Sequence, residues 1–207
     1  MNAYDVMSIS PIVPVIALDN ERDALPLAEA LLEGGIRIME ITLRTPAGLT
    51  SIETIAKTMP EMHVGAGTVC NPSDLKSALE HGSGFVFSPG ITPGLIASAE
   101  ANKIPFIPGV GSASEVMLAQ NSGLLHVKLF PATVVGGTSA LKAFGGPFAS
   151  MRFCPTGGIT LANMNDFLKL DNVLCVGGSW IVPKGAIMQG DFKQITALAR
   201  EALQSIR

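Results

Sequence analysis

Short apolar runs alternate with amphipathic segments along the whole chain. Apolar runs of four to eight residues are typical of buried strands, and apolar residues spaced at helical intervals predict helices. The strand-like runs are residues 13–18, 36–43, 63–69, 85–89, 106–110, 126–130, 152–156 and 173–177. The candidate helices between and after them include 23–35, 71–83, 92–103, 160–170 and 191–205. Eight strand-then-helix units in sequence predict a parallel sheet covered by helices.

The ends of several predicted helices carry recognisable signals. Asn71 is placed to cap the helix in 71–83, Pro72 stands at its first position, and Gly82 closes it. The segments beginning at Thr92 and Thr160 are expected to open in a similar way. Pro26 lies inside the first helical pattern, so the sequence leaves the start of that helix open.

The repeated unit predicts an α/β fold, a (β/α)8 TIM barrel of parallel strands, as one domain over residues 1–207. Eight units in 207 residues leave roughly 25 residues per unit, which is compact for a fold that usually needs about 250 residues. An open doubly wound sheet is the alternative. It is disfavoured because no GxGxxG fingerprint follows the first strand.

Polar residues collect where the second strand ends. Glu40, Thr42 and Arg44 share one parity of the strand alternation, so all three are expected to face the barrel interior or its mouth. Active sites of such barrels lie at the carboxyl ends of the strands. A purely structural Glu40–Arg44 pair is the alternative interpretation.

The sixth strand carries a lysine at a position where lysine is rare. Lys128 shares its parity with His126 and Phe130 and is expected to point inward at the depth of Glu40. Burial favours the uncharged form of an amine, and an uncharged amine can attack a carbonyl carbon. The alternative is that Lys128 merely neutralises an inward glutamate.

Glycine pairs follow the last two strands, in "CPTGGIT" and "VGGSWIVP". Open backbone N–H groups in these two loops are a frequent phosphate site in barrels, and Ser179 adds a hydroxyl. Thr68 ends the third strand and Pro89 follows the fourth, where each has a structural alternative: a threonine bonded to main chain, and a proline that shapes a turn.

Composition narrows the function further. The net charge is −3, with no basic stripe, so nucleic acid is not an expected partner. Three cysteines without CxxC spacing argue for a reducing compartment, and three histidines, none of them at ligand spacing, do not predict a metal site. No signal peptide or transmembrane run is visible, so the expected location is the cytoplasm and no membrane partner is expected.

Taken together, these motifs resemble a known family. The segments "VPVIAL", "GGIRIMEITLRT", "VGAGTV", "FSPGITP", "VKLFPA", "RFCPTGGI" and "VLCVGGSWIVP" are similar to those of the bacterial 2-keto-3-deoxy-6-phosphogluconate (KDPG) aldolases, which also act as 4-hydroxy-2-oxoglutarate (KHG) aldolases. The likeness runs from about residue 9 to residue 203.

The resemblance implies a metal-free, cofactor-free class I aldolase of the (β/α)8 fold that assembles as a homotrimer. It would cleave KDPG to pyruvate and glyceraldehyde 3-phosphate, and KHG to pyruvate and glyoxylate. By the same resemblance, Lys128 would form the Schiff base and Glu40 would be the general acid/base. The residues that would bind the pyruvate part are Arg44, Thr68, Pro89 and Phe130, and those that would receive the phosphate are Gly157, Gly158, Gly178 and Ser179. Thr133 stands where relatives have glutamate, in a loop at the edge of the expected site, and its contribution to substrate preference stays open.

Two other functions are compatible with the same residues. A sugar-phosphate isomerase or epimerase would use Glu40 as a base and Lys128 as an electrostatic clamp, without an imine. A non-catalytic binding protein for phosphorylated sugar acids would use the glycine pairs and pair Lys128 with a carboxylate. A covalent adduct between Lys128 and pyruvate separates the aldolase from both.

Overall fold

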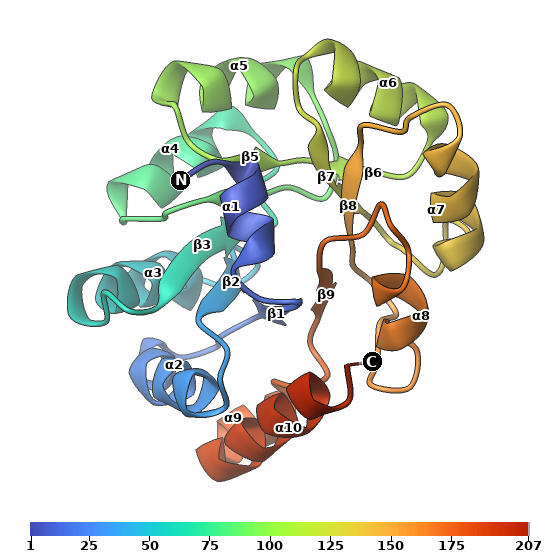
Figure 1. Cartoon of the computed structure of the whole chain (residues 1–207). Helices are drawn as coiled ribbons and strands as arrows, with labels where there is room; N and C mark the ends of the chain where they lie inside the picture. Colours follow the sequence, from blue (N-terminus) through green and yellow to red (C-terminus); the bar gives the residue numbers. More distant parts are fainter. Residues whose placement is uncertain (207) are drawn as a thin grey trace.

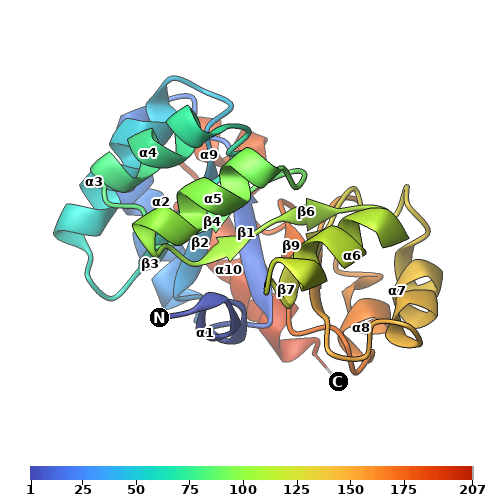
Figure 2. The same ribbon diagram turned by 90° about the horizontal axis from the view of Figure 1, so that it is seen from above.

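The computed structural model describes residues 1–206 as parallel strands surrounded by helices (Figures 1 and 2). The strands are β1 (Ile12–Ile16), β2 (Ile38–Thr42), β3 (His63–Gly67), β4 (Val86–Phe87), β5 (Phe106–Ile107), β6 (Gly109–Val110), β7 (His126–Leu129), β8 (Arg152–Pro155) and β9 (Val176–Gly178). The helices are α1 (Ala3–Ser8), the short 3-10 turn η1 (Glu21–Asp23), α2 (Ala24–Glu33), α3 (Ala47–Thr58), α4 (Pro72–Glu80), α5 (Pro93–Asn102), α6 (Ala113–Asn121), α7 (Gly137–Gly145), α8 (Met164–Leu168), α9 (Lys184–Gln189) and α10 (Phe192–Gln204).

The strands form two parallel sheets, in the orders β5-β4-β3-β2-β1-β9 and β6-β7-β8. Pro108 alone separates β5 from β6, and a proline has no N–H with which to continue a ladder. Isolated parallel bridges join Phe153 to Val173 and Thr156 to Gly177, so the β8 segment lies beside the chain that leads into β9. The predicted α/β class with parallel strands is confirmed.

All eight predicted strand positions carry strands, with the fifth divided at Pro108. The predicted cap of α4 is confirmed, because the Asn71 side chain accepts the N–H of Asp74 and Pro72 is the first helical residue. Pro26 lies in the first turn of α2, where its missing N–H has no intrahelical partner to lose.

The start predicted for the 160–170 helix is wrong. The Asn163 side chain accepts the N–H of Thr160 and folds these residues into a turn, so α8 begins only at Met164. Helices α1 and α9 fall outside the eight predicted strand-then-helix units.

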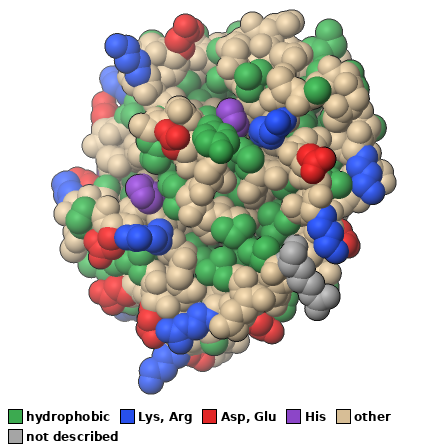
Figure 3. Space-filling view, in the orientation of Figure 1, with side chains coloured by type: hydrophobic (Ala, Val, Ile, Leu, Met, Phe, Trp, Pro, Cys, Tyr) green, Lys and Arg blue, Asp and Glu red, His purple; other side chains and the backbone are tan. Residues whose placement is uncertain are grey.

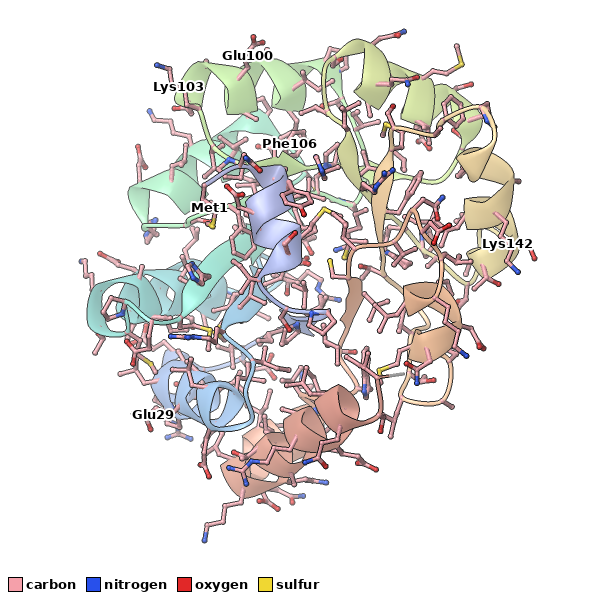
Figure 4. The ribbon with its side chains drawn as sticks, viewed as in Figure 1. Met1, Glu29, Glu100, Lys103, Phe106 and Lys142 are labelled. Carbon is pink, nitrogen blue, oxygen red and sulfur yellow. The ribbon has the colours of Figure 1, made fainter. Side chains whose placement is uncertain are left out.

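The short helix α1 lies across the amino-terminal ends of the strands (Figure 1). Its Tyr4 ring meets the ring of His126, the first residue of β7, edge to face with centroids 5.7 Å apart. On this face hydrophobic side chains occupy much of the centre and most charged ones lie nearer the edge (Figure 3). A cavity of about 350 Å³ opens there beside Met1, Lys103 and Phe106, which Figure 4 labels. No helix within residues 1–206 combines the length and the apolar composition needed to cross a bilayer.

Candidate active site

A cavity of about 390 Å³ lies at the carboxyl ends of the strands, within the usual size range for a small-molecule site. All ten residues that the sequence marked as candidate site residues line it: Glu40, Arg44, Thr68, Pro89, Lys128, Phe130, Gly157, Gly158, Gly178 and Ser179. The remaining lining residues are Val15, Thr156 and Ile159. The structure therefore brings all of the predicted positions to one place.

The centre of the cavity is a buried pair of opposite charges. Lys128 Nζ lies 3.0 Å from Glu40 Oε1 and 3.2 Å from Glu40 Oε2, although 88 residues separate the two in sequence. The side chains are only 5% and 2% exposed, and the rings of Phe87 and Phe130 lie 5.2 and 5.5 Å from the amine. A proton can pass directly between this amine and this carboxylate, and the apolar walls keep bulk water from screening them.

Arg44 is held at the mouth by its own strand. Its Nε donates to Thr42 Oγ1 at 3.2 Å, and the Thr42 hydroxyl donates to the carbonyl of Ile16 on the neighbouring strand at 2.8 Å. Among the described residues, the Glu40 carboxylate pairs with Lys128 and not with Arg44, so the structural Glu40–Arg44 pair is not formed. The guanidinium can therefore bind a carboxylate that enters the cavity.

Thr68 and Pro89 enter the cavity from the ends of β3 and β4. Thr68 has φ +59°, a left-handed conformation that, within residues 1–206, only Lys103 shares among non-glycine residues. Such backbone strain in a non-glycine residue is costly and is concentrated at functional sites. The loop that carries Pro89 is closed by the Ser88 hydroxyl, which donates to the carbonyl of Gly90.

The far end of the cavity is formed by the loops after β8 and β9. Gly157 and Gly158 both have left-handed φ, +101° and +77°. A Cβ on Gly158 would lie 2.1 Å from Thr133 Oγ1, and one on Gly178 would lie 2.1 Å from the Trp180 ring. Other side chains thus occupy the space beside these glycines, and the groups that they can offer to a ligand are those of the backbone.

Thr133 ties the β7 loop to this glycine pair. Its backbone N–H and its hydroxyl both donate to the carbonyl of Gly157, at 3.2 and 3.3 Å. Thr133 is itself exposed and does not line the cavity.

Sequence reasoning did not assign Val15, Thr156 or Ile159 to the site. Val15 pairs with Glu40 in the parallel register, so its place follows once that register is known. The Thr156 side chain is buried at the end of β8, and its hydroxyl donates to the carbonyl of Cys154 at 3.4 Å. Strand alternation would have placed Thr156 on the same face as Cys154, but it does not distinguish a lining hydroxyl from a core one.

Two buried or half-buried groups, Cys175 and His126, have shifted pKa values. The pKa of the buried Cys175 thiol is raised well above its usual value by its hydrogen bond with Cys154 and by burial. Burial, and then the charge of Arg152, lowers the pKa of His126. A protonated thiol is a poor metal ligand. Residues 1–206 hold no group of three or more His, Cys, Asp or Glu side chains that could bind a metal ion.

A buried lysine and a carboxylate within hydrogen-bond distance, at the carboxyl ends of parallel strands, form the arrangement that a class I aldolase, a carbon–carbon lyase, requires. The family model for KDPG and KHG aldolase matches residues 4–198. The chain belongs to this family, which confirms the family resemblance and the lyase class predicted from the sequence.

Individual relatives are similar in sequence to this chain over nearly its whole length. The chain is 48% identical to the KHG/KDPG aldolase of Escherichia coli K12, over 100% of this chain and 97% of that protein. It is 50% identical to the 2-dehydro-3-deoxy-phosphogluconate aldolase of Pseudomonas aeruginosa, over 93% and 88% of the two chains.

A solved structure shows the same likeness in three dimensions. The KDPG aldolase of Legionella pneumophila, in a crystal structure with pyruvate captured at low pH as a covalent carbinolamine intermediate, is 44% identical. Its TM-score is 0.96, with 98% of each chain covered.

Proposed function

We propose that this protein cleaves KDPG to pyruvate and glyceraldehyde 3-phosphate through an imine on Lys128, and that it also cleaves KHG to pyruvate and glyoxylate. The observation that carries the proposal is the buried contact of Lys128 Nζ with both oxygens of Glu40, at 3.0 and 3.2 Å, inside a cavity open to a small molecule.

The pair supports the first chemical step. Glu40 takes a proton from the Lys128 ammonium, and the free amine attacks the 2-keto carbon of the substrate. Glu40 returns its proton to the hydroxyl of the resulting carbinolamine, which leaves as water, so a protonated imine forms and Glu40 is again a carboxylate. This cation draws electrons from the bond between C3 and C4 far better than the neutral ketone does.

The same carboxylate serves the bond cleavage. Glu40 accepts the proton of the C4 hydroxyl while the C3–C4 bond breaks, so the aldehyde leaves and the bonding electrons remain on C3 as an enamine. Glu40 then returns a proton to C3. Water hydrolyses the imine, which releases pyruvate and restores Lys128. Proton transfer by a positioned group of this kind contributes roughly 10²–10⁴-fold to a rate.

The two ends of the cavity orient the substrate. We assign the carboxylate of the substrate to Arg44 and Thr68, with Pro89 and Phe130 packing against the carbon chain. We assign the phosphate to the backbone N–H groups of Gly157, Gly158 and Gly178 and to the Ser179 hydroxyl, because these residues line the cavity where β8 and β9 end.

The proposal extends to the architecture. The bridges between the β8 segment and the chain before and within β9, together with the single proline between β5 and β6, support a closed (β/α)8 barrel that forms one domain over residues 1–207. We also propose that the protein assembles as a homotrimer, as the family resemblance implies, and that it lies in the cytoplasm. Its ligands are small 2-keto acids.

Borohydride trapping tests the proposal. The protein is incubated with pyruvate, reduced with sodium borohydride and digested, and the peptide that contains Lys128 is analysed by mass spectrometry. We expect a reduced pyruvate adduct on Lys128. Complete absence of an adduct would remove the aldolase mechanism and favour an isomerase or a binding protein. An adduct at another lysine would contradict the assignment of Lys128.

A further inference from the structure

Two interior positions of β3 carry no side chain. In the parallel register Glu40 lies opposite Gly65 and Thr42 lies opposite Gly67, so β3 runs directly beside the strand that carries the carboxylate. Both glycines are buried. Neither has a left-handed φ, so the backbone at these positions would accept an alanine without strain.

The space beside Gly67 is filled by the catalytic carboxylate. A Cβ at Gly67 would lie 2.1 Å from Glu40 Oε1, 2.5 Å from its Cγ and 2.6 Å from its Cδ. These distances are far below van der Waals contact, which for carbon atoms is about 3.5–4.0 Å. An alanine at position 67 therefore requires the Glu40 side chain to move by about 1 Å or more.

The space beside Gly65 is filled by something different. A Cβ there would lie 2.2 Å from two atoms of the Phe85 ring, and Phe85 is fully buried. An alanine at this position therefore disturbs a packed aromatic ring and not a charged group. The two glycines lie on one strand and differ in what their missing side chains make room for.

We propose that Gly67 is a positioning residue for the reaction: its missing side chain lets the Glu40 carboxylate lie against Lys128. This inference rests on the proposed function, in which Glu40 moves protons. The carboxylate is held between the Gly67 backbone on one side and the Lys128 amine, 3.0 Å away, on the other. A displaced carboxylate no longer lies within proton-transfer distance of the amine and of the groups at C3 and C4 of the bound substrate. Misplacement by 1 Å can cost about 10²-fold in rate.

Gly67→Ala is the test, with Gly65→Ala as its matched control. Two quantities are measured with pyruvate: the amount of imine trapped by borohydride, and the rate of deuterium exchange at the pyruvate methyl group followed by NMR in D2O. We expect the exchange rate per trapped imine to fall by roughly 10²-fold in Gly67→Ala. In Gly65→Ala it should stay within about twofold of the parent, even where the melting temperature falls. Equal ratios in the two variants, or an unchanged ratio in Gly67→Ala, would overturn the proposal.

If Gly67→Ala fails to fold, a double-mutant cycle tests whether Gly67 makes room for the Glu40 side chain. The structure predicts that Gly67→Ala is tolerated once the glutamate side chain is truncated, so the Glu40→Ala/Gly67→Ala variant should unfold at the temperature of Glu40→Ala alone. A double variant that remains unfolded or less stable would show that Gly67 serves the fold through other contacts, against the proposal.

The same experiments separate this inference from the proposed function. If Glu40→Gln leaves methyl exchange unchanged, the acid/base role of Glu40 is wrong. If Glu40→Gln abolishes exchange while Gly67→Ala preserves it, only the role of Gly67 is wrong.

Discussion

The two ends of the cavity offer different chemical groups to a ligand. At one end Lys128, Glu40 and Arg44 supply charged side chains, and two of these are almost fully buried. At the other end Gly157, Gly158 and Gly178 supply backbone, and Ser179 adds the only side-chain hydroxyl among these four. The first end depends on chemical groups that a substitution can delete. The second depends on a loop shape that a substitution can only obstruct.

This difference leads us to expect a graded response to mutation. Changes at the charged end should stop the reaction for every substrate, because every substrate forms the same imine. Changes at the glycine end should affect substrates according to the group that they place there. The four predictions below test that contrast from the largest expected effect to the smallest.

Replacing Lys128 by arginine should abolish cleavage of both KDPG and KHG. Arginine keeps a positive charge opposite Glu40, but a guanidinium does not act as the amine nucleophile. Pyruvate release and borohydride adducts are the measurements. Lys184→Arg is the control, because Lys184 is 65% exposed and pairs with Asp19 outside the cavity lining. Cleavage by Lys128→Arg at a substantial rate would show that the charge alone is enough.

Glu40→Gln should slow methyl exchange of pyruvate by at least about 10²-fold, while imine still forms. Glutamine keeps the shape of the side chain and removes the group that carries the proton. Exchange in D2O is followed by NMR, and Glu53→Gln, in an exposed pair with Lys57, serves as the control. Unchanged exchange would remove Glu40 from the acid/base role.

Ser179→Ala should lower kcat/KM for KDPG by roughly 10–150-fold. A hydrogen bond to a charged group contributes about 1.5–3 kcal/mol, which corresponds to that range. The effect on KHG should be much smaller, and imine formation with pyruvate should hardly change. Steady-state kinetics with both substrates measure the contrast. Equal losses for the two substrates would mean that Ser179 supports the fold and does not bind phosphate.

Extended dialysis against EDTA should leave the cleavage of both substrates unchanged. The imine supplies the electron sink that a metal would otherwise supply, and residues 1–206 offer no cluster of ligands for one. Activity before and after dialysis is the measurement. A loss that zinc or magnesium restores would point to class II chemistry and contradict the metal-free imine mechanism on which the charged end depends.

Much of the charged end could be predicted from the sequence because strands alternate. Glu40 and Lys128 each share a parity with polar or aromatic neighbours, and that alone placed both inside the fold at similar depth. The Schiff-base and acid/base roles came from family resemblance and chemistry. The 3.0 Å contact between the two side chains is geometry that only the structure provides.

Other features could not be predicted because the sequence segments are too short to show a pattern, or because the residue has no side chain whose type would indicate a role. Helix α1 spans six residues, too few to show a helical period. The start predicted for α8 was wrong because the Asn163 side chain accepts the N–H of Thr160, a local hydrogen bond that competes with the helix. A glycine such as Gly67 gives no sign of which neighbour needs its space, so its relation to Glu40 appears only in three dimensions.

The placement of the three cysteines has a practical consequence for handling this protein. Cys70 is exposed, whereas Cys154 and Cys175 are buried, and the raised pKa of Cys175 keeps that thiol protonated at neutral pH. An alkylating reagent added to the folded protein should therefore label a single site, at Cys70, and full labelling should require unfolding. The number of labels per chain, read by intact mass, then reports the folded fraction of a preparation without any assay of catalysis.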